Sequence, residues 1–383
     1  MDGDQFSGFR EINSIIERDS KDTTYKFALL RGVIEISQEH AGLAREVGAE
    51  VEFPLGLLVE KWILYYYPLV ELDEIIPQKS NGEGEDCGYQ ISFRKDLKKV
   101  TDYYRDFGGL SAFYRDYVSG TFPDGVEADV LALMKRVRST ITGMPMKHLG
   151  HSLSKEDYSI FRCATRPLKP DRCIDQKFLI ARAGTFSFRR ELFDVFQYLG
   201  SFIAGEDSLL YKWAEFSAKA DKTGTVTQDQ VLAKLTTRPE TERAMMDARG
   251  VYISHLASKG SLECVWSGRE IPSTEALHID HAIPFSLWRN NELWNLLPAT
   301  SRVNAGKRDM IPSPSLIDER AGAIVDHWHL LHDAFPVRFM NEMAVSLIGK
   351  PTFSSRWEEV GITNLREKCD YLIDVRGFAE WTL

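Results

Sequence analysis

The sequence predicts an α+β protein: a mainly helical chain that carries one small unit of two strands and a helix in its C-terminal half. Apolar residues recur at helical spacing over much of the chain, as at Phe27, Leu30 and Ile34. Residues 277–283 instead form a β-prone run that Pro284 ends. The chain has 383 residues, 43% of them hydrophobic and 27% charged, which is enough for two or three domains with buried cores.

Residues 1–150 are predicted to form a helical N-terminal domain that serves recognition or partner binding. Residues 78–88, rich in glycine and charge, are the clearest loop. The helical pattern stops at 143–154, where Gly, Pro and His replace it, so a domain boundary is placed there. The helices of this domain are expected within 4–40, 53–70, 96–117 and 126–138.

Residues 151–250 are interpreted as a mixed, basic connecting region. Short β-like runs at 158–163 and 178–183 precede helices at 189–202 and 208–220. The cluster of basic side chains here fits a solvated protein surface and a nucleic-acid track equally well. The candidate nucleic-acid contacts in it are Arg162, Arg166, Arg182, Arg189 and Arg190.

Residues 251–315 are predicted to form the functional domain. A helix over 239–259 leads into it, and 262–271 is expected to be a β-hairpin that turns at Ser267 and Gly268. After the strand at 277–283 come a polar loop, a second apolar run at 294–297 and a helix over 301–308. Beyond this domain, 316–383 is predicted to be a C-terminal helical region.

The polar residues of this domain suit the hydrolysis of a phosphodiester. Asp280 and Asn304 are hard oxygen donors, and two such ligands leave the other positions around a Mg²⁺ ion to water and phosphate. His281 follows Asp280 on the strand and points to the opposite face, so it is assigned as the general base. An Asn side chain or the backbone near Asn295 is expected to hold its other ring nitrogen. Lys307 lies three residues after Asn304 and is expected to face the phosphate charge.

These residues resemble the HNH (ββα-metal) nuclease family, and in particular the zinc-free type of the RNA-guided CRISPR nucleases. The shared pattern is Asp-His, an Asn fourteen residues after the His, and Asn-x-x-Lys nine residues later. The resemblance covers residues 261–314. It implies that Asp280 and Asn304 bind the metal, that His281 activates water, and that Asn295 orients His281.

Mg²⁺ is therefore the expected cofactor, with Mn²⁺ as a substitute. No structural zinc is expected, because Cys264 is followed three residues later by Ser267 and no second Cys-x-x-Cys pair stands near Asn304. Arg302 and Arg308 flank the predicted metal ligand along the helix and are further candidate nucleic-acid contacts.

The five cysteines are scattered and odd in number, and no signal peptide precedes them, so a cytoplasmic protein without disulfides is expected. Glu60 and Lys61 interrupt the apolar stretch 55–72, and Pro68 would kink it. A buried helix, and no membrane span, is predicted there.

A formal net charge of −9 opposes unguided binding to DNA phosphates. The expected function is a Mg²⁺-dependent DNA endonuclease, by family analogy one of bacterial restriction or anti-phage defence. An activating or recruiting protein partner, such as an ATPase or a sensor, or a homodimer is expected. A guide RNA is not, because the chain lacks the size and the second nuclease domain of the RNA-guided enzymes. Two alternatives stay open: a non-catalytic nucleic-acid-binding subunit, and a nuclease that acts on RNA or single-stranded DNA.

Overall fold

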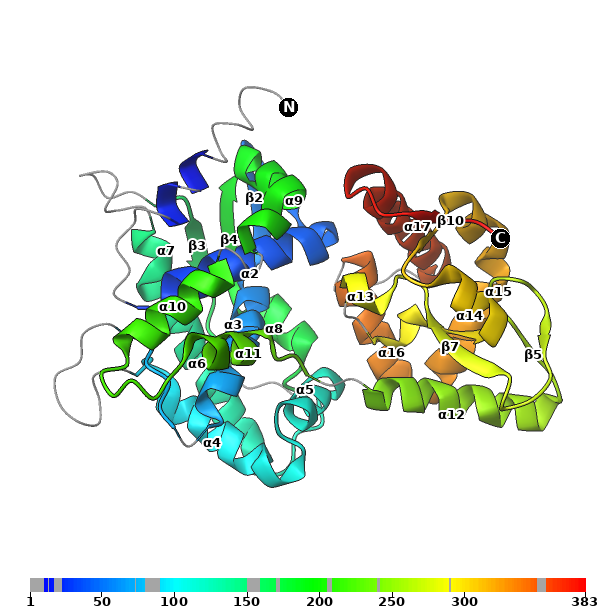
Figure 1. Cartoon of the computed structure of the whole chain (residues 1–383), viewed down its shortest axis with the longest axis horizontal. Helices are drawn as coiled ribbons and strands as arrows, with labels where there is room; N and C mark the ends of the chain where they lie inside the picture. Colours follow the sequence, from blue (N-terminus) through cyan, green and yellow to red (C-terminus); the bar gives the residue numbers. More distant parts are fainter. Residues whose placement is uncertain are drawn as a thin grey trace. The chain divides into compact units, whose positions relative to one another are not determined.

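The chain divides into two compact units, Met1–Pro239 and Glu240–Leu383 (Figure 1). The boundaries expected near residues 150 and 315 fall inside these units. No boundary lies at 250, because α12 (Glu242–Lys259) runs unbroken through that position. The structure, a computed structural model, describes residues 10–12, 14–16, 23–72, 74–79, 90–149, 159–169, 173–204, 209–239, 242–288, 291–349 and 356–383.

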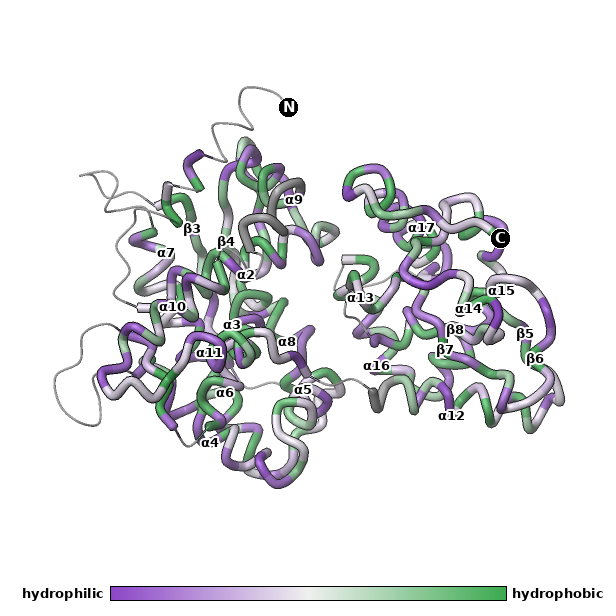
Figure 2. The backbone as a smooth tube through the Cα atoms, viewed as in Figure 1, coloured by the Kyte–Doolittle hydropathy of each residue, from purple (hydrophilic) through white to green (hydrophobic). Residues whose placement is uncertain are grey.

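The N-terminal unit is built around the helix α3 (Leu55–Val70). All of its residues except Lys61 and Leu64 are buried, because it is apolar or aromatic on most sides (Figure 2). The buried helix predicted in the stretch 55–72 is thus confirmed, over Leu55–Val70. The helices around it are α2 (Tyr25–Glu39), α4 (Arg94–Tyr104), α5 (Gly109–Ser119), α6 (Val126–Gly143), α7 (Pro145–His148), α8 (Gln176–Arg182), α9 (Arg190–Ala204), α10 (Tyr211–Ala220) and α11 (Gln228–Thr236).

One antiparallel sheet completes this unit, in the order β1-β2-β4-β3. Val51 pairs with Phe188 and Phe53 pairs with Phe186, so one face of the sheet carries apolar side chains into the core. The strands are β1 (Arg45–Val47), β2 (Glu50–Pro54), β3 (Arg162–Thr165) and β4 (Gly184–Arg189).

The strand predicted at 178–183 is wrong. These residues belong to the helix α8, which the Asp175 carboxylate begins by accepting a 2.7 Å hydrogen bond from the Phe178 N–H. The strand lies just after it, as β4. In a run of only six residues the spacing of apolar side chains does not distinguish a helix from a strand. The N-cap residue Asp175 is the feature that identifies this run as a helix. The predicted loop at 78–88 lies mostly outside the described residues.

In the C-terminal unit, helices pack around two antiparallel strand pairs, β5–β6 and β7–β8, and one parallel pair, β9–β10. Its core includes Trp266, Trp294 and Trp328. Its helices are α12, α13 (Phe285–Trp288), α14 (Ser301–Lys307), α15 (Pro314–Ala334), α16 (Pro336–Glu342) and α17 (Trp357–Asp370), with single turns of other helical types at Leu293–Asn295, Met343–Ile348 and Tyr371–Val375. Its strands are β5 (Leu262–Glu263), β6 (Glu270–Ile271), β7 (Leu277–His281), β8 (Leu296–Thr300), β9 (Ile311–Pro312) and β10 (Glu380–Trp381).

The elements that hold the predicted site residues follow one another as strand, strand and helix. β7 pairs with β8 in antiparallel register, and α14 follows β8 directly and contacts both strands. The Thr300 hydroxyl caps α14 by accepting from the Val303 N–H. The predicted hairpin at 262–271 is confirmed, since β5 pairs with β6. The Val265 N–H donates to the Pro298 carbonyl at 2.9 Å and thereby fixes this hairpin against β8.

Among the described residues, no helix combines the length and the apolar character that crossing a bilayer requires.

Candidate active site

Asp280 and His281 lie at the end of β7, opposite Leu297 and Leu296 of β8. Because they are neighbours on a strand, their side chains point to opposite faces. Asp280 is 4% exposed, whereas His281 is half-buried. The strand therefore presents a buried carboxylate on one side and an accessible imidazole on the other.

Two donors hold the Asp280 carboxylate. The Trp266 indole N–H donates to Oδ2 at 2.5 Å, and the Lys307 ammonium lies 3.3 Å from the carboxylate oxygens. Burial raises the pKa of Asp280, and the Lys307 charge and the Trp266 N–H oppose that rise. Trp266 comes from the β5–β6 hairpin and Lys307 from α14, so three separate elements meet at this carboxylate.

Lys307 is fully buried, and its ammonium also donates to the His281 carbonyl at 2.5 Å. Burial lowers the pKa of Lys307, and the Asp280 carboxylate opposes that change. The sequence predicts that this side chain faces a phosphate, but here it points inward to the carboxylate. A buried carboxylate needs a countercharge, and Lys307 is the cation that α14 brings to it.

The His281 imidazole is held by Asn291. The ring Nε2 lies 2.5 Å from the Asn291 Oδ1, and the Phe285 ring lies beside the imidazole with centroids 5.5 Å apart. Burial lowers the pKa of His281, which favours the neutral ring that a general base requires.

Asn295, the residue predicted to orient His281, has a different set of contacts. Its Oδ1 accepts from the Ile283 N–H at 2.8 Å and its Nδ2 donates to the Ile283 carbonyl at 3.0 Å. Its backbone carbonyl accepts from the Ala282 N–H. Asn295 therefore fixes the chain just after His281 and acts on the backbone, and the side chain on the imidazole is that of Asn291.

Asn304 lies on α14 one turn before Lys307, on a neighbouring part of the same helix face. It is half-buried, and its side-chain amide has no hydrogen-bond partner within the residues that the structure describes. Within those residues, no three His, Cys, Asp or Glu side chains gather as a metal site. Asp280 and Asn304 together supply two oxygen donors, a set that fits a hard cation which keeps water and substrate oxygens as its other ligands.

Two of the predicted nucleic-acid contacts lie on this helix or just after it. Arg302 and Arg308 are exposed, and neither has an ion-pair partner in the described part of the chain. Asp309 follows Arg308 and accepts a 2.9 Å hydrogen bond from the Ser286 hydroxyl of α13. Arg302 therefore lies on the exposed side of α14, and Arg308 follows the end of this helix.

The other predicted contacts all lie in the N-terminal unit. Arg162 pairs with Glu50 at 3.2 Å, and Arg190 pairs with Glu46 and Asp194. Arg189 pairs with Glu11 and Glu191. Arg166 lies in the loop after β3 and Arg182 at the end of α8, both exposed. Three of these five cations are thus neutralised by carboxylates on the same surface.

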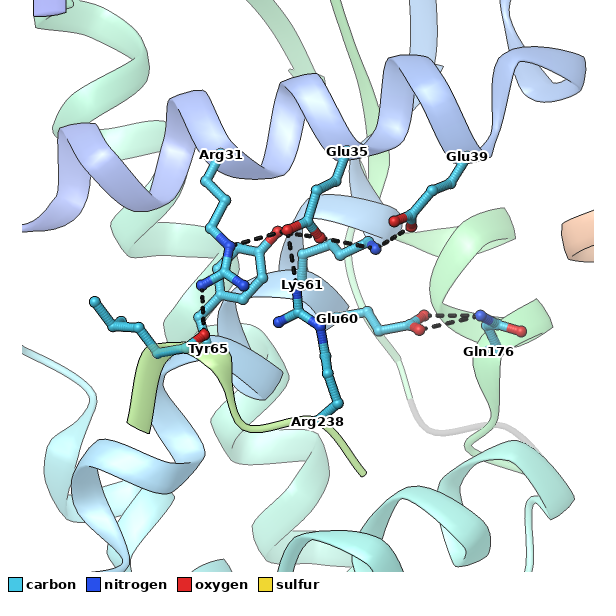
Figure 3. Close-up of polar contacts among 9 residues, drawn as sticks. Arg31, Glu35, Glu39, Glu60, Lys61, Tyr65, Gln176 and Arg238 are labelled. Atoms are coloured by element: carbon cyan, nitrogen blue, oxygen red, sulfur yellow. Dashed lines mark hydrogen bonds and ion pairs between the residues drawn. The ribbon is translucent and has the colours of Figure 1, made fainter. Parts of the chain in front are cut away.

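The N-terminal unit also contains a cluster of charges in its interior (Figure 3). The Glu35 carboxylate accepts from Arg31, Arg238 and Tyr65 and pairs with Lys61, and Lys61 also contacts Glu39. Burial alone would raise the pKa of Glu35, but the surrounding cations hold it well below its usual range. Because each charge is matched within the cluster, its role is to join α2, α3 and the segment after α11.

The candidate site thus combines the buried Asp280 carboxylate, the half-buried His281 imidazole and, on the adjoining helix, Asn304. Residues 264–313 match the family described as HNH endonuclease, so the C-terminal unit carries an HNH endonuclease domain, as predicted. The chain as a whole belongs to the family described as Domain of unknown function (DUF8808), which matches residues 5–235. No curated protein and no solved structure matches the chain.

Two residues of the site were not predicted, Trp266 and Asn291. Each contacts a site residue that is 14 or 10 positions away in the sequence. Trp266 lies in the turn of a hairpin and Asn291 in a polar loop, and no sequence spacing predicts that such residues contact Asp280 and His281. The only signal was the need of a buried carboxylate and of a catalytic imidazole for partners.

Proposed function

We propose that this protein is a Mg²⁺-dependent HNH endonuclease that hydrolyses phosphodiester bonds of DNA. The observation that carries the proposal is the packing of α14, which carries Asn304, against β7, which carries Asp280 and His281, inside the segment that matches the HNH endonuclease family. Mn²⁺ is expected to replace Mg²⁺, because both accept carboxylate, amide and water oxygens.

In this proposal Asp280 and Asn304 hold the metal, which supplies positive charge to the phosphate when bound. The neutral His281 ring takes the proton from the attacking water. Trp266 and Lys307 fix the Asp280 carboxylate and keep it ionised in its buried position. Arg302 and Arg308 place the nucleic-acid backbone along α14 by charge attraction.

One such centre cuts one strand, because it has a single general base and a single pair of metal ligands. A double-strand break would require two copies of the chain or two successive cuts. The acidic balance of the sequence and the paired arginines of the N-terminal unit support recruitment by a protein partner, such as an ATPase or sensor, over free DNA binding. We propose a role in bacterial restriction or anti-phage defence, with the N-terminal unit as the part that recognises the target or the partner.

The proposal is tested by cleavage of a supercoiled plasmid in Mg²⁺, Mn²⁺ or EDTA. The wild type is expected to nick the plasmid only with metal, and His281→Ala and Asn304→Ala are expected to be inactive. His329→Gln on α15 is the matched control, since this half-buried histidine contacts Glu358 and Trp357 of α17 and none of the candidate site residues, and should cut like the wild type.

Three outcomes would change the assignment. If cleavage survives both site substitutions, the HNH centre is not the nuclease. If the wild type binds DNA but cuts under no condition, the domain is a docking module. If single-stranded DNA or RNA is cut while duplex is not, the chemistry stands and the substrate is different.

A further inference from the structure

The contact between His281 and Asn291 determines which nitrogen of the imidazole is the base. The Asn291 Oδ1 lies 2.5 Å from the His281 Nε2. An amide oxygen can only accept a hydrogen bond, so the proton of the neutral ring must lie on Nε2. The lone pair then lies on Nδ1, for which the described residues offer no hydrogen-bond partner. One ring nitrogen is thus fixed and the other is free to accept a proton.

Asn291 is well placed to fix the ring, because the chain that follows it is immobilised. Asn291 is only 6% exposed. The Leu293 N–H donates to the Glu342 carboxylate at 2.7 Å, and the Trp294 indole donates to Glu292 at 2.6 Å and to Ser346 at 2.8 Å. A side chain whose backbone is held in this way loses little further entropy when it binds the imidazole.

Asn295 does not hold the His281 ring in the observed structure. Both ends of the Asn295 amide are bound to the backbone of Ile283. These two hydrogen bonds resemble those that a neighbouring strand would make, and they fix the backbone between His281 and Pro284. The two asparagines therefore act on different parts of the chain, one on the imidazole and one on the backbone.

We propose that Asn291 is the positioning residue of the general base: it selects the His281 tautomer with the proton on Nε2 and leaves Nδ1 to take the proton from water. This rests on the proposed nuclease function and assigns to Asn291 the role that the family resemblance gave to Asn295. Asn295 is then a residue of the fold, needed for stability more than for the proton transfer.

The test compares two nearly isosteric substitutions. Asn291→Leu removes the acceptor and keeps the branched shape of the side chain, whereas Asn291→Asp keeps an acceptor oxygen. The tautomer of His281 is read from long-range ¹H–¹⁵N correlations of histidine-labelled full-length protein at about pH 8, where the ring is neutral. The His281 signals are assigned by their loss in His281→Ala.

The wild type and Asn291→Asp are expected to show the Nε2–H tautomer, and Asn291→Leu a mixture of both tautomers. Plasmid cleavage by Asn291→Leu should fall about 10- to 100-fold in kcat with KM within about twofold, because only the orientation of the base is lost. Asn291→Asp should recover most of that loss. Asn295→Leu should instead lower the melting temperature and leave the Nε2–H tautomer in the molecules that stay folded.

A wild type with its proton on Nδ1 would overturn the proposal, and this measurement needs no variant to fold. An Asn291→Leu protein that keeps the Nε2–H tautomer and the wild-type kcat would overturn it as well. The nuclease function fails separately: a wild type with the expected tautomer and no cleavage in any metal would remove the proposed function and leave the role of Asn291 in holding the ring.

Discussion

Arg308 adopts a backbone conformation that residues with side chains rarely take. Its φ is 49° and its ψ is −124°, and among the described residues it is the one non-glycine residue with positive φ. It lies in the turn after α14, where the Met310 N–H donates to the Lys307 carbonyl at 3.0 Å. Such a conformation costs about 1–3 kcal/mol. The strained residue directly follows Lys307, the last residue of α14.

Arg308→Gly is expected to raise the free energy of unfolding by about 1 kcal/mol, because glycine adopts this conformation without strain. Arg302→Gly is the matched change inside α14 and is expected to lower it by about 0.5–1 kcal/mol, because glycine disfavours a helix. Denaturant titration of both variants measures the two effects. If both substitutions lowered the free energy of unfolding to the same extent, the Arg308 backbone would not be strained.

His327 is a buried histidine with no catalytic role. It lies on α15 against the Tyr252 ring, and neither ring nitrogen has a hydrogen bond of good geometry within the described residues, although the Glu263 backbone is close enough to favour the charged ring slightly. Burial lowers the pKa of His327 to about 4. The folded protein therefore keeps this ring neutral under conditions in which the unfolded chain is protonated.

The sign of the pH effect follows from this difference. The unfolded ring has a pKa of about 6.5, so below that pH the unfolded chain binds a proton that the folded protein does not. Stability is full above about pH 6.5 and falls as the pH drops toward about 4, with a loss of about 2 kcal/mol at about pH 5. His327→Leu should lose this part of the acid sensitivity in thermal or denaturant unfolding. His329→Gln, a change at a half-buried position of the same helix, should keep the wild-type slope.

At the scale of secondary structure elements, the interior charge cluster joins segments that are distant in the sequence. Glu35 on α2 binds Lys61 on α3 and Arg238 after α11, and the Arg31 guanidinium also donates to the Leu235 carbonyl at 3.0 Å. The last residues of the N-terminal unit are thereby attached to its two central helices. The cluster is a structural device, because its charges are satisfied by one another (Figure 3).

Removal of Glu35 is expected to be far more costly than removal of Glu39. Glu35 is 15% exposed and its loss would leave buried cations unpaired, so Glu35→Ala should lower the free energy of unfolding by about 3 kcal/mol. Glu39 is 38% exposed and pairs with Lys61, which keeps its partner Glu35 when Glu39 is removed, so Glu39→Ala should cost less than about 1 kcal/mol. Denaturant titration compares them. Equal losses would mean that burial of the cluster contributes nothing.

At the scale of the whole molecule, charge sets the way in which the nuclease meets nucleic acid. The chain carries a formal net charge of −9, and acidic residues outnumber basic ones in both units. Three of the five arginines predicted as a nucleic-acid track are paired with carboxylates, whereas Arg302 and Arg308 have no ion-pair partner among the described residues. The isolated protein should therefore bind DNA weakly and through few phosphates.

The salt dependence of binding measures that number of phosphates. Two contacts predict a slope of about −2 in a plot of log K against log salt, or a loss of roughly tenfold between about 50 and 200 mM. Arg302→Gln should reduce the slope by about 1, whereas Arg189→Gln, in an ion pair on the other unit, should leave it unchanged. A steep slope that Arg189→Gln reduces would place the DNA on the N-terminal unit instead.

Much of the local structure could be predicted from the sequence. The strand at 277–281, the hairpin at 262–271 and the helix at 301–307 follow from periodicity and turn residues. The second strand was placed too early, since 293–295 form a helical turn and β8 begins at Leu296. The hairpin of β1 and β2 and the pairing of β9 with β10 were missed. β1, β9 and β10 are only two or three residues long, too short to show an alternating pattern, and β9 and β10 are also far apart in the sequence.

The sequence by itself determined the chemistry that is present: an Asp-His pair, an Asn and a Lys at fixed spacing on a strand and a helix, matched to a nuclease family. Only the tertiary structure decided which groups touch. In the folded protein the His281 ring contacts Asn291, and the Lys307 ammonium contacts the buried Asp280 carboxylate. Arg162, Arg189 and Arg190 of the N-terminal unit pair with carboxylates. Spacing along the chain fixes the face on which a side chain lies, but its hydrogen-bond partner depends on burial and on elements that approach from far away in the sequence.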